Sequence, residues 1–429
     1  MAIDYIVPLG EETGQKMLEA LKGQASELGK LVMLKEAEVG HGITTIADWG
    51  EVSALVSEDL AKDVFPLGTV LHEKWVDPRS TVSTEWDYGL RVVAHEQVNV
   101  RGREDVPGLT LHSKLALPFG TAFDASEAFY AAPEGGLAAG TYTVAFGNTS
   151  AWGAVPANAQ VSFTLTKDLP AGGQLCFSSS VYSTAPAACN VVSYATAGAT
   201  EALETVACSD EAAAGAVSLG TIPATAAAYD PDGTLNHLHR IGLGSNRWKT
   251  SALRQWLNSA AAAGSWWTPQ TKWDRPPAYA STTAGFLSAF SEDFVDHLAY
   301  REIKTALPYI DGGTSKGTEC DTTHDRVWLP AAEQLYWNCE WLGVPYGLEG
   351  DAWEWWKEAY GGATPASMGV VHEEFRMASM DAPTTMRSVF ERSAYRNNGN
   401  GVACCNAGGY LGSGTASNGY SCAPAYTFI

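Results

Sequence analysis

Residues 393–429 read SAYRNNGNGVACCNAGGYLGSGTASNGYSCAPAYTFI, and this stretch decides how the end of the chain is interpreted. One side chain in it, Arg396, is charged, and most of the others are Tyr, Ser, Asn, Gly, Thr, Cys or Ala. Tyr offers a large, rigid contact, while Ser, Asn and Gly offer adaptable hydrogen bonds, the mixture of antibody-like binding surfaces. A frayed, Gly-rich tail is the alternative. Because the closing APAYTFI contains aromatic and β-branched residues, we expect a strand that ties the terminus into a sheet.

The chain has 429 residues, a formal net charge of −21 and a pI near 4.8. This length predicts two or three domains. A nucleic-acid partner is not expected, because neutralising phosphates requires a basic face. No stretch approaches the roughly 20 apolar residues of a membrane helix, and the N-terminus lacks a basic flank before an apolar run. We therefore expect synthesis in the cytoplasm, no Sec-type export and no membrane insertion.

The eight cysteines form no CxxC pair. Neighbours such as Cys404 and Cys405 cannot close an unstrained disulfide, because disulfide geometry needs Cα atoms further apart than 3.8 Å. We expect mostly free thiols. Bridges between Cys176 and Cys189, or between Cys320 and Cys339, stay open at this point.

Residues 1–63 are interpreted as a helical assembly segment. Within residues 16–36, apolar residues recur at alternating steps of three and four, as a and d positions do: Leu18, Leu21, Ala25, Leu28 and Val32. A weak coiled coil that gathers subunits and an amphipathic helix packed on its own chain are both consistent with this pattern. A second helix is expected at 46–61, with Thr45 and Asp48 as a capping box.

Residues 64–232 are interpreted as an antiparallel β-sandwich that serves as a spacer. Apolar residues alternate with period two along TYTVAF (141–146) and QVSFTLT (160–166), and Gly and Pro punctuate further runs. These strands carry no clustered carboxylates, no nucleophile with a nearby base and no phosphate loop. The segment Asp230-Pro231-Asp232-Gly233 reads as a linker rather than as a calcium loop, because the EF-hand spacing does not continue.

Residues 233–429 are interpreted as an α+β domain. Eleven of the 15 tryptophans lie between 236 and 360. Ser251 and Ser291 are expected to cap two helices, with Phe290 as a staple for the second. A short strand at 327–329 is expected to lead through Pro330 into a helix reaching residue 337.

Candidate chemical groups in this domain have simpler structural explanations. His237 and His239 lie on one face of a strand but lack a third metal ligand in view. Asp321, His324 and Asp325 are interpreted as a loop with local hydrogen bonds. The acidic residues have helical spacing and predict a solvated helix face: Glu349, Asp351, Glu354 and Glu358. Cys404, Cys405 and Cys422 lack a basic partner that would lower their pKa. No enzyme, metal or cofactor is therefore expected.

The runs SNRWKTSALRQWLNS, WWTPQTKWDRPP, FLSAFSEDF, DRVWLPAAEQLY, ERSAYRNNGN and NGYSCAPAY resemble a family found in phages and prophages of gut bacteria. In outline it is similar to the C-type lectin-like fold of the variable proteins of diversity-generating retroelements. The resemblance is strong over 236–429 and weaker over 64–232.

The resemblance implies a division of the C-terminal repeat into scaffold and variable positions. The scaffold would be Arg392, Ser393, Ala394, Val402, Gly409, Leu411, Ala416, Gly419, Ala423 and Pro424. The ligand-binding positions would be Tyr395, Asn397, Asn398, Asn400, Cys405, Asn406, Tyr410, Ser413, Thr415, Ser417, Asn418 and Tyr420. Where many relatives have Trp-Leu before the Arg-Ser pair, this chain has Phe390-Glu391. That departure bears on active diversification rather than on the fold.

The function implied is that of a non-enzymatic protein on the surface of a phage particle. It would bind a protein or glycan ligand on a cell surface and contact other virion subunits, and a homotrimer formed through residues 16–36 would add avidity. One alternative is a fixed structural virion or tail decoration protein. The other is an enzyme similar to formylglycine-generating proteins, which use a cysteine pair with copper.

Overall fold

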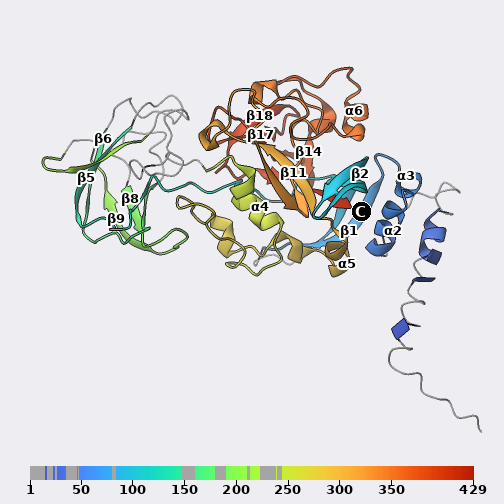
Figure 1. Cartoon of the computed structure of the whole chain (residues 1–429), viewed down its shortest axis with the longest axis horizontal. Coiled ribbons are helices and arrows are strands. Elements are labelled where there is room, and N and C mark those ends of the chain that lie inside the picture. The colour runs from blue at the N-terminus through green and yellow to red at the C-terminus, as the bar shows by residue number, and fades with distance from the viewer. Residues whose placement is uncertain are drawn as a thin grey trace, which may run out of the picture.

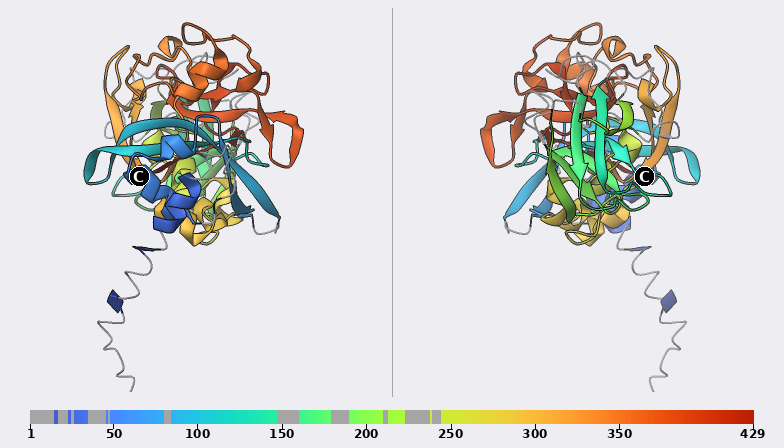
Figure 2. Two further views of the ribbon diagram at one scale, coloured as in Figure 1. Left: turned by 90° about the vertical axis from the view of Figure 1, so that its right-hand side faces the viewer. Right: turned by 90° about the vertical axis from the view of Figure 1, so that its left-hand side faces the viewer.

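Two bodies of unequal size make up the computed structural model of the chain (Figure 1). The structure describes residues 15–16, 23–24, 27–34, 46, 48–79, 84–146, 160–178, 190–209, 213–222, 238 and 244–429. The smaller body, called the sandwich, comprises the described residues between 128 and 222. The larger, called the main body, comprises the described residues between 27 and 123 together with 244–429. Figure 2 (right) views the sandwich end-on in front of the main body. Within the described residues the sandwich contains strands without helices, and the main body combines strands with short helices, so the fold is α+β and mostly β.

A seven-stranded sheet forms the centre of the main body, in the order β12-β11-β2-β3-β20-β13, with β1 paired to β2. Its strands are β1 (Val70–Val76), β2 (Glu85–Val100), β3 (Arg103–Ser113), β11 (Arg301–Ala306), β12 (Cys320–Asp325), β13 (Val327–Trp328) and β20 (Ala425–Phe428). Every pairing is antiparallel. The expected C-terminal strand is therefore present, and it lies between β3 and β13.

This sheet crosses the predicted boundaries at residues 64 and 233. Strands β1 to β3 belong with the C-terminal strands and not with the sandwich. The helices α2 (Trp49–Ser57) and α3 (Ala61–Val64) join the same core, where Trp49 stacks on Phe428 with ring centroids 4.8 Å apart. The change from helical to alternating periodicity near residue 64 marks a change of secondary structure within one body.

The sandwich contains two sheets around a separate core that includes Val144, Phe163 and Val191. One sheet has the order β10-β5-β6 and the other β4-β7-β8-β9. The strands are β4 (Tyr130–Ala131), β5 (Gly140–Phe146), β6 (Gln160–Leu165), β7 (Gln174–Ser178), β8 (Asn190–Tyr194), β9 (Ala202–Ala207) and β10 (Val217–Ile222). The strands expected from TYTVAF and QVSFTLT are confirmed. Unlike the antiparallel arrangement expected, β10 and β5 are parallel.

The C-terminal segment forms a four-stranded sheet in the order β18-β17-β16-β19. Its strands are β16 (Val389–Ala394), β17 (Gly401–Cys405), β18 (Leu411–Thr415) and β19 (Ser421–Cys422). A hairpin of β14 (Met377–Ser379) and β15 (Ala382–Arg387) precedes it. The uncharged stretch of the sequence is thus ordered as strands and the turns that join them.

Short helices complete the main body. The α-helices are α4 (Ala252–Leu257), α5 (Glu292–His297) and α6 (Glu354–Tyr360). The 3-10 turns are η3 (Trp248–Thr250), η4 (Ala278–Ser281), η5 (Phe286–Ala289), η6 (Tyr309–Asp311), η7 (Glu340–Leu342) and η8 (Glu373–Phe375). Both predicted caps are confirmed: Ser251 accepts a hydrogen bond from the amide of Arg254, and Ser291 accepts one from that of Phe294.

Three local predictions are wrong. No helix follows Pro330: residues 332–336 form turns, and Tyr336 has a φ of 63°, a left-handed conformation that ends a helix. The second helix begins at its cap Asp48, whose carboxylate accepts from the amides of Gly50 and Glu51. The predicted loop around His324 is strand β12, because residues 320–325 pair with β11.

Residues 27–34 are helical. Lys30 reaches Glu58 at 2.5 Å and Met33 is buried, so one side of the helix faces the main body. Leu28 and Val32, two members of the expected a and d series, are exposed, whereas Leu18, Leu21 and Ala25 lie outside the described residues. Among the described residues, no helix is both long enough and apolar enough to cross a bilayer.

Candidate ligand-binding surface

Most of the expected scaffold positions are buried. Val402, Leu411 and Ala416 are inaccessible, and the other buried members are Arg392, Ser393, Ala394, Gly409, Ala423 and Pro424. Gly419 differs, because it is exposed. Both faces of the central strand β17 are covered, since Cys404 and Cys405 point to opposite sides and both are buried. Solvent therefore reaches the turns and the edge strand β18, while β17 has no open face.

The expected ligand-binding positions fall into three groups. Asn397, Tyr410 and Ser413 are exposed. Half-buried positions are Tyr395, Asn398, Asn406, Thr415, Ser417, Asn418 and Tyr420. Asn400 and Cys405 are buried, so the structure contradicts their assignment as ligand-facing residues. Ser413 pairs with Ala403 in the middle of β17. The remaining positions lie near the two ends of β17, which are about 13 Å apart in a five-residue strand.

Local contacts explain the two buried positions. The Cys405 thiol lies 2.6 Å from the carbonyl oxygen of Phe375, beneath the segment that covers this face of the sheet. The carbonyl of Asn400 accepts a hydrogen bond of 2.9 Å from the amide of Ala416, which joins the 395–400 loop to the turn after β18. Both residues stabilise the scaffold.

Glycines let the tyrosine rings lie against the backbone. A methyl group added to Gly414 would lie 2.5 Å from the ring of Tyr420, and one added to Gly408 would lie 2.9 Å from the ring of Tyr410. The Tyr420 ring also packs on Phe390, with centroids 5.0 Å apart. Rings held in this way offer contact area at little cost in side-chain entropy.

Two polar side chains hold the 395–400 loop in place. The amide nitrogen of Asn246 donates to the carbonyls of Tyr395, Asn398 and Gly401 at 3.2, 2.7 and 2.9 Å. Arg396, which is fully buried, donates to main-chain carbonyls of three other segments and to a carboxylate of Glu319. The one charged side chain of the stretch is thus an internal anchor. The sequence analysis gave Asn246 no role, although it lies in the run SNRWKTSALRQWLNS.

Exposed apolar residues flank the turns at both ends of β17. At one end, the amide of His372 donates to the carbonyl of Gly409 at 3.0 Å, which brings exposed Val371 beside the 406–410 turn. At the other end, Trp341 packs on Tyr395, and the same loop carries exposed Tyr346. Large apolar side chains in Gly- and Pro-rich loops were a usable signal that the sequence reasoning did not include.

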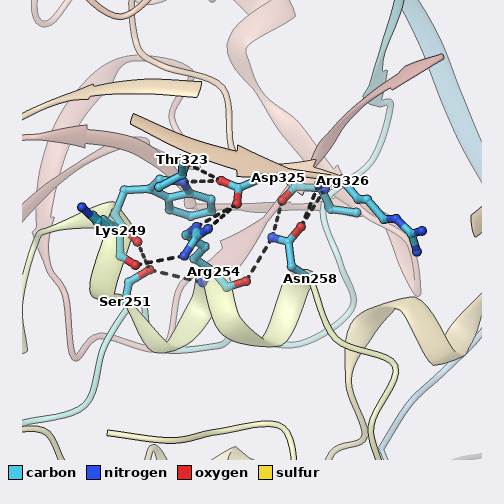
Figure 3. A network of polar contacts seen from close by, with 9 residues as sticks. Lys249, Ser251, Arg254, Asn258, Thr323, Asp325 and Arg326 are labelled. Atoms are coloured by element: carbon cyan, nitrogen blue, oxygen red, sulfur yellow. Dashed lines mark hydrogen bonds and ion pairs between the residues drawn. The ribbon is translucent and has the colours of Figure 1, made fainter. Parts of the chain in front are cut away.

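A polar network in the tryptophan-rich part has a structural role (Figure 3). Asp325 is buried and accepts hydrogen bonds from Trp248, Arg254 and Thr323 at 3.0, 2.8 and 2.7 Å. Asn258 accepts from two main-chain amides and donates to the carbonyl of Val327 at 2.7 Å. These bonds tie α4 to β12 and β13, so the motifs SALRQWLN and DRVWLP meet in a joint.

A second buried network surrounds Arg392. Its guanidinium donates to Gln334 at 2.6 Å and to the carbonyls of Leu329 and Glu349 at 2.8 and 2.5 Å. The carboxylate of Glu349 accepts from Ser393 and from a main-chain amide. The interpretation of Glu349 as part of a solvated helix face is therefore wrong, although Glu354 and Glu358 do lie on α6.

The thiols of the C-terminal sheet are poor nucleophiles. Burial raises the pKa of Cys404 to about 12, and it raises the pKa values of Cys405 and Cys422 well above the ordinary range. Cys320 and Cys339 are both free, which removes the proposed bridge between them. Cys176 is also free, and Cys189 lies outside the described residues.

His237, His239 and the segment 230–233 also lie outside the described residues. Within the part of the chain that the structure describes, no group of three metal-ligating side chains is present.

Comparison with known proteins gives one similarity. A family model described as a domain of unknown function (DUF6273) matches residues 233–364. No curated protein and no solved structure matches the chain significantly. The matched residues include α4, β11 to β13, α6 and the network around Asp325, and they end before the C-terminal sheet. Over this part, which is less than half of its length, the chain is similar to a family whose description states no function.

Proposed function

We propose that this protein is a non-enzymatic binding protein that recognises a protein or glycan ligand through the turns at 395–400, 406–410 and 415–420. In this proposal it is displayed on the particle of a phage or prophage, and its C-terminal domain has a C-type lectin-like fold. Asn400 and Cys405 are left out of the contact set because both are buried.

One observation carries the proposal: between residues 393 and 422, Arg396 and the larger apolar residues are buried, while the exposed and half-buried Tyr, Asn, Ser and Thr residues lie mainly in the turns. Gly, Asn and Ser are ordinary turn residues, so the distinguishing features are the tyrosines and the lack of an exposed charged side chain in these turns. Tyrosines beside small polar residues on a rigid frame match the composition of evolved binding surfaces. A few such aromatic residues typically supply most of the binding free energy, about 2 kcal/mol or more each.

The first experiment searches for the ligand with the full-length protein, on a glycan array and on intact cells of the strain that carries the gene. A triple variant, Tyr395→Ala with Tyr410→Ala and Tyr420→Ala, should lose binding. Tyr395 and Tyr420 also pack on Trp341 and Phe390, so a modest drop in thermal midpoint is expected as well. Retained binding by a folded triple variant would refute the proposal.

The origin of the surface is tested by the flanking DNA. Active diversification requires a reverse-transcriptase gene and a nearby copy of the coding segment for residues 393–424 that differs only at adenines. If the reverse-transcriptase gene and the copied segment are absent, the amino-acid sequence of the surface is not being diversified. An empty ligand screen, together with burial of the same turns in an isolated particle, would favour the alternative of a structural decoration protein.

A further inference from the structure

A second surface lies on the opposite part of the main body, at strand β1. This strand is at the margin of the central sheet and pairs only with β2, in register from Val70↔Arg91 to Val76↔Glu85. Figure 2 (left) shows these blue strands beside the N-terminal helices. Among the described residues, no segment bonds to the other edge of residues 70–76. Within the described part of the chain, the outer edge of these seven residues is therefore unpaired.

The bonds at the two ends of the hairpin show which main-chain groups face the opening. The amide of Asp77 donates to the carbonyl of Thr84 at 3.0 Å, and the carbonyl of Thr69 accepts from Val92 at 2.8 Å. Antiparallel strands alternate the direction of these groups, so odd-numbered residues bond to β2. The N–H and C=O groups of His72 and Lys74 therefore point toward the open edge, the arrangement to which another strand adds.

A cavity of about 720 Å³ adjoins this edge. Both strands of the hairpin and the beginnings of α2 and α5 line it: His72, Glu73, Lys74, Glu85, Trp86, Asp87, Ile46, Trp49, Ser291 and Asp293. The indole N–H of Trp86 is buried and has no hydrogen-bond partner among the described residues. A buried donor without a partner favours an acceptor supplied from outside.

The charges of the cavity favour a basic ligand. Four carboxylates line it, and three of them already have a basic partner: Glu85 pairs with Lys74 at 2.6 Å, Asp87 contacts His72 at 2.7 Å, and Asp293 contacts His297 at 3.2 Å. Glu73 is 8% exposed and accepts a hydrogen bond of 2.6 Å from Trp49, but no cation lies beside it among the described residues. An ammonium or guanidinium group entering the cavity would complete this site.

We propose that the open edge of β1 binds an extended segment of a partner protein, which adds as a further strand and places a Lys or Arg side chain in the cavity beside Glu73. Main-chain bonds to His72 and Lys74 hold the segment, and the cavity selects its basic residue. A second copy of this chain is disfavoured, because two molecules that each have a net charge of −21 repel one another.

The test measures binding of a labelled synthetic peptide to the full-length protein by fluorescence anisotropy. The peptide alternates threonine and valine around one central lysine. A matched peptide with glutamate in place of lysine should bind at least about tenfold more weakly, and Glu73→Gln should weaken the lysine peptide by about tenfold. Equal binding of the two peptides, or no binding of the lysine peptide at millimolar concentration, would overturn the proposal.

Matched variants separate strand addition from a side-chain contact. Lys74→Pro removes the outward N–H without breaking a bond to β2 and should abolish binding, whereas Lys74→Ala should retain it. A peptide methylated at alternate amide nitrogens should not bind the unaltered protein, because it lacks the N–H groups that pair with β1. This measurement tests strand addition even if Lys74→Pro does not fold. If Lys74→Ala lost peptide binding as completely as Lys74→Pro, strand addition would be contradicted. If sedimentation showed a dimer of the unaltered protein that Lys74→Pro converts to a monomer, the edge would bind a second copy of the chain and not a partner segment.

Discussion

The sandwich and the main body differ in how far apart in the sequence their partners lie. All the strands of the sandwich come from residues 130–222, and its core is separate. The central sheet of the main body instead joins β3 to β20, with Leu111 opposite Tyr426. Local alternation of apolar residues suffices to predict the strands of the sandwich. The central sheet of the main body forms only through contacts between residues that are distant in the sequence. Truncations and mutations should therefore affect the two bodies differently.

Removal of β20 should have the largest effect. A chain ending at Pro424 loses the strand between β3 and β13, and with it the buried rings of Tyr426 and Phe428. We expect the main body not to fold, while the sandwich keeps its own transition in differential scanning calorimetry. Loss of both transitions would show that the two bodies are not independent, and survival of both would contradict the central position of β20.

Phe163→Ala should act on the sandwich alone. Phe163 is buried in the separate core, and truncation of a buried Phe costs about 3–5 kcal/mol. The sandwich transition should fall in temperature while that of the main body stays in place. Val217→Ala on exposed β10 is the matched control and should change neither transition. A shift of both transitions by Phe163→Ala would mean that the cores are coupled.

Asp325→Asn should act on the main body alone. It weakens the joint between α4 and β12 and leaves Arg254 without its carboxylate partner, a loss of about 3 kcal/mol for a buried pair. Chemical denaturation monitored by tryptophan fluorescence measures this effect. Glu373→Gln is the control, because it breaks an exposed pair with Arg376 worth less than about 1 kcal/mol. Equal effects of the two variants would remove the structural role proposed for the joint.

A pH-dependent effect is expected at the junction of the two bodies, where the main-chain carbonyl of Asp274 accepts a hydrogen bond of 3.3 Å from Gln174 of β7. Burial, together with nearby Glu127, raises the pKa of Asp274 from 3.8 to about 6. Asp274 therefore adds stability that is fully present below pH 3.8 and is lost as the pH rises through about 6, up to about 3 kcal/mol in total. Asp274→Asn should flatten this part of the stability curve between pH 4 and 7. An unchanged slope would show that Asp274 titrates normally.

The sequence was informative wherever the signal was local. Serine caps at Ser251 and Ser291 and the alternation within β5 and β6 predicted their elements, because neighbouring residues determine both. The expected helix after Pro330 failed for a tertiary reason: Gln334 is buried and accepts from Arg392, in a turn that the network around Arg392 requires.

The sequence predicted the amino-acid composition of the candidate surface, but not all of its buried residues or the contacts that hold its loops. The exposure of Tyr410 and the burial of Val402 could be predicted from the chemistry of their side chains. The burial of Cys405 could not, because its thiol contacts the carbonyl of Phe375, 30 residues earlier in the chain. Nor does any pattern reveal that Asn246 binds three carbonyls of the 395–401 segment. The open edge of β1 likewise appears only once the order of the strands is known.

The central claim is that exposed aromatic residues of the C-terminal turns contact a ligand. Tyr410 and Tyr300 provide a matched pair, since they are 38% and 37% exposed and only Tyr410 lies on the proposed surface. The measurement is binding of the full-length protein to intact cells of the strain that carries the gene. We expect Tyr410→Ala to lower the affinity at least about tenfold with an unchanged thermal midpoint, and Tyr300→Ala to bind normally. Equal binding by both variants, or unfolding of Tyr410→Ala, would contradict it.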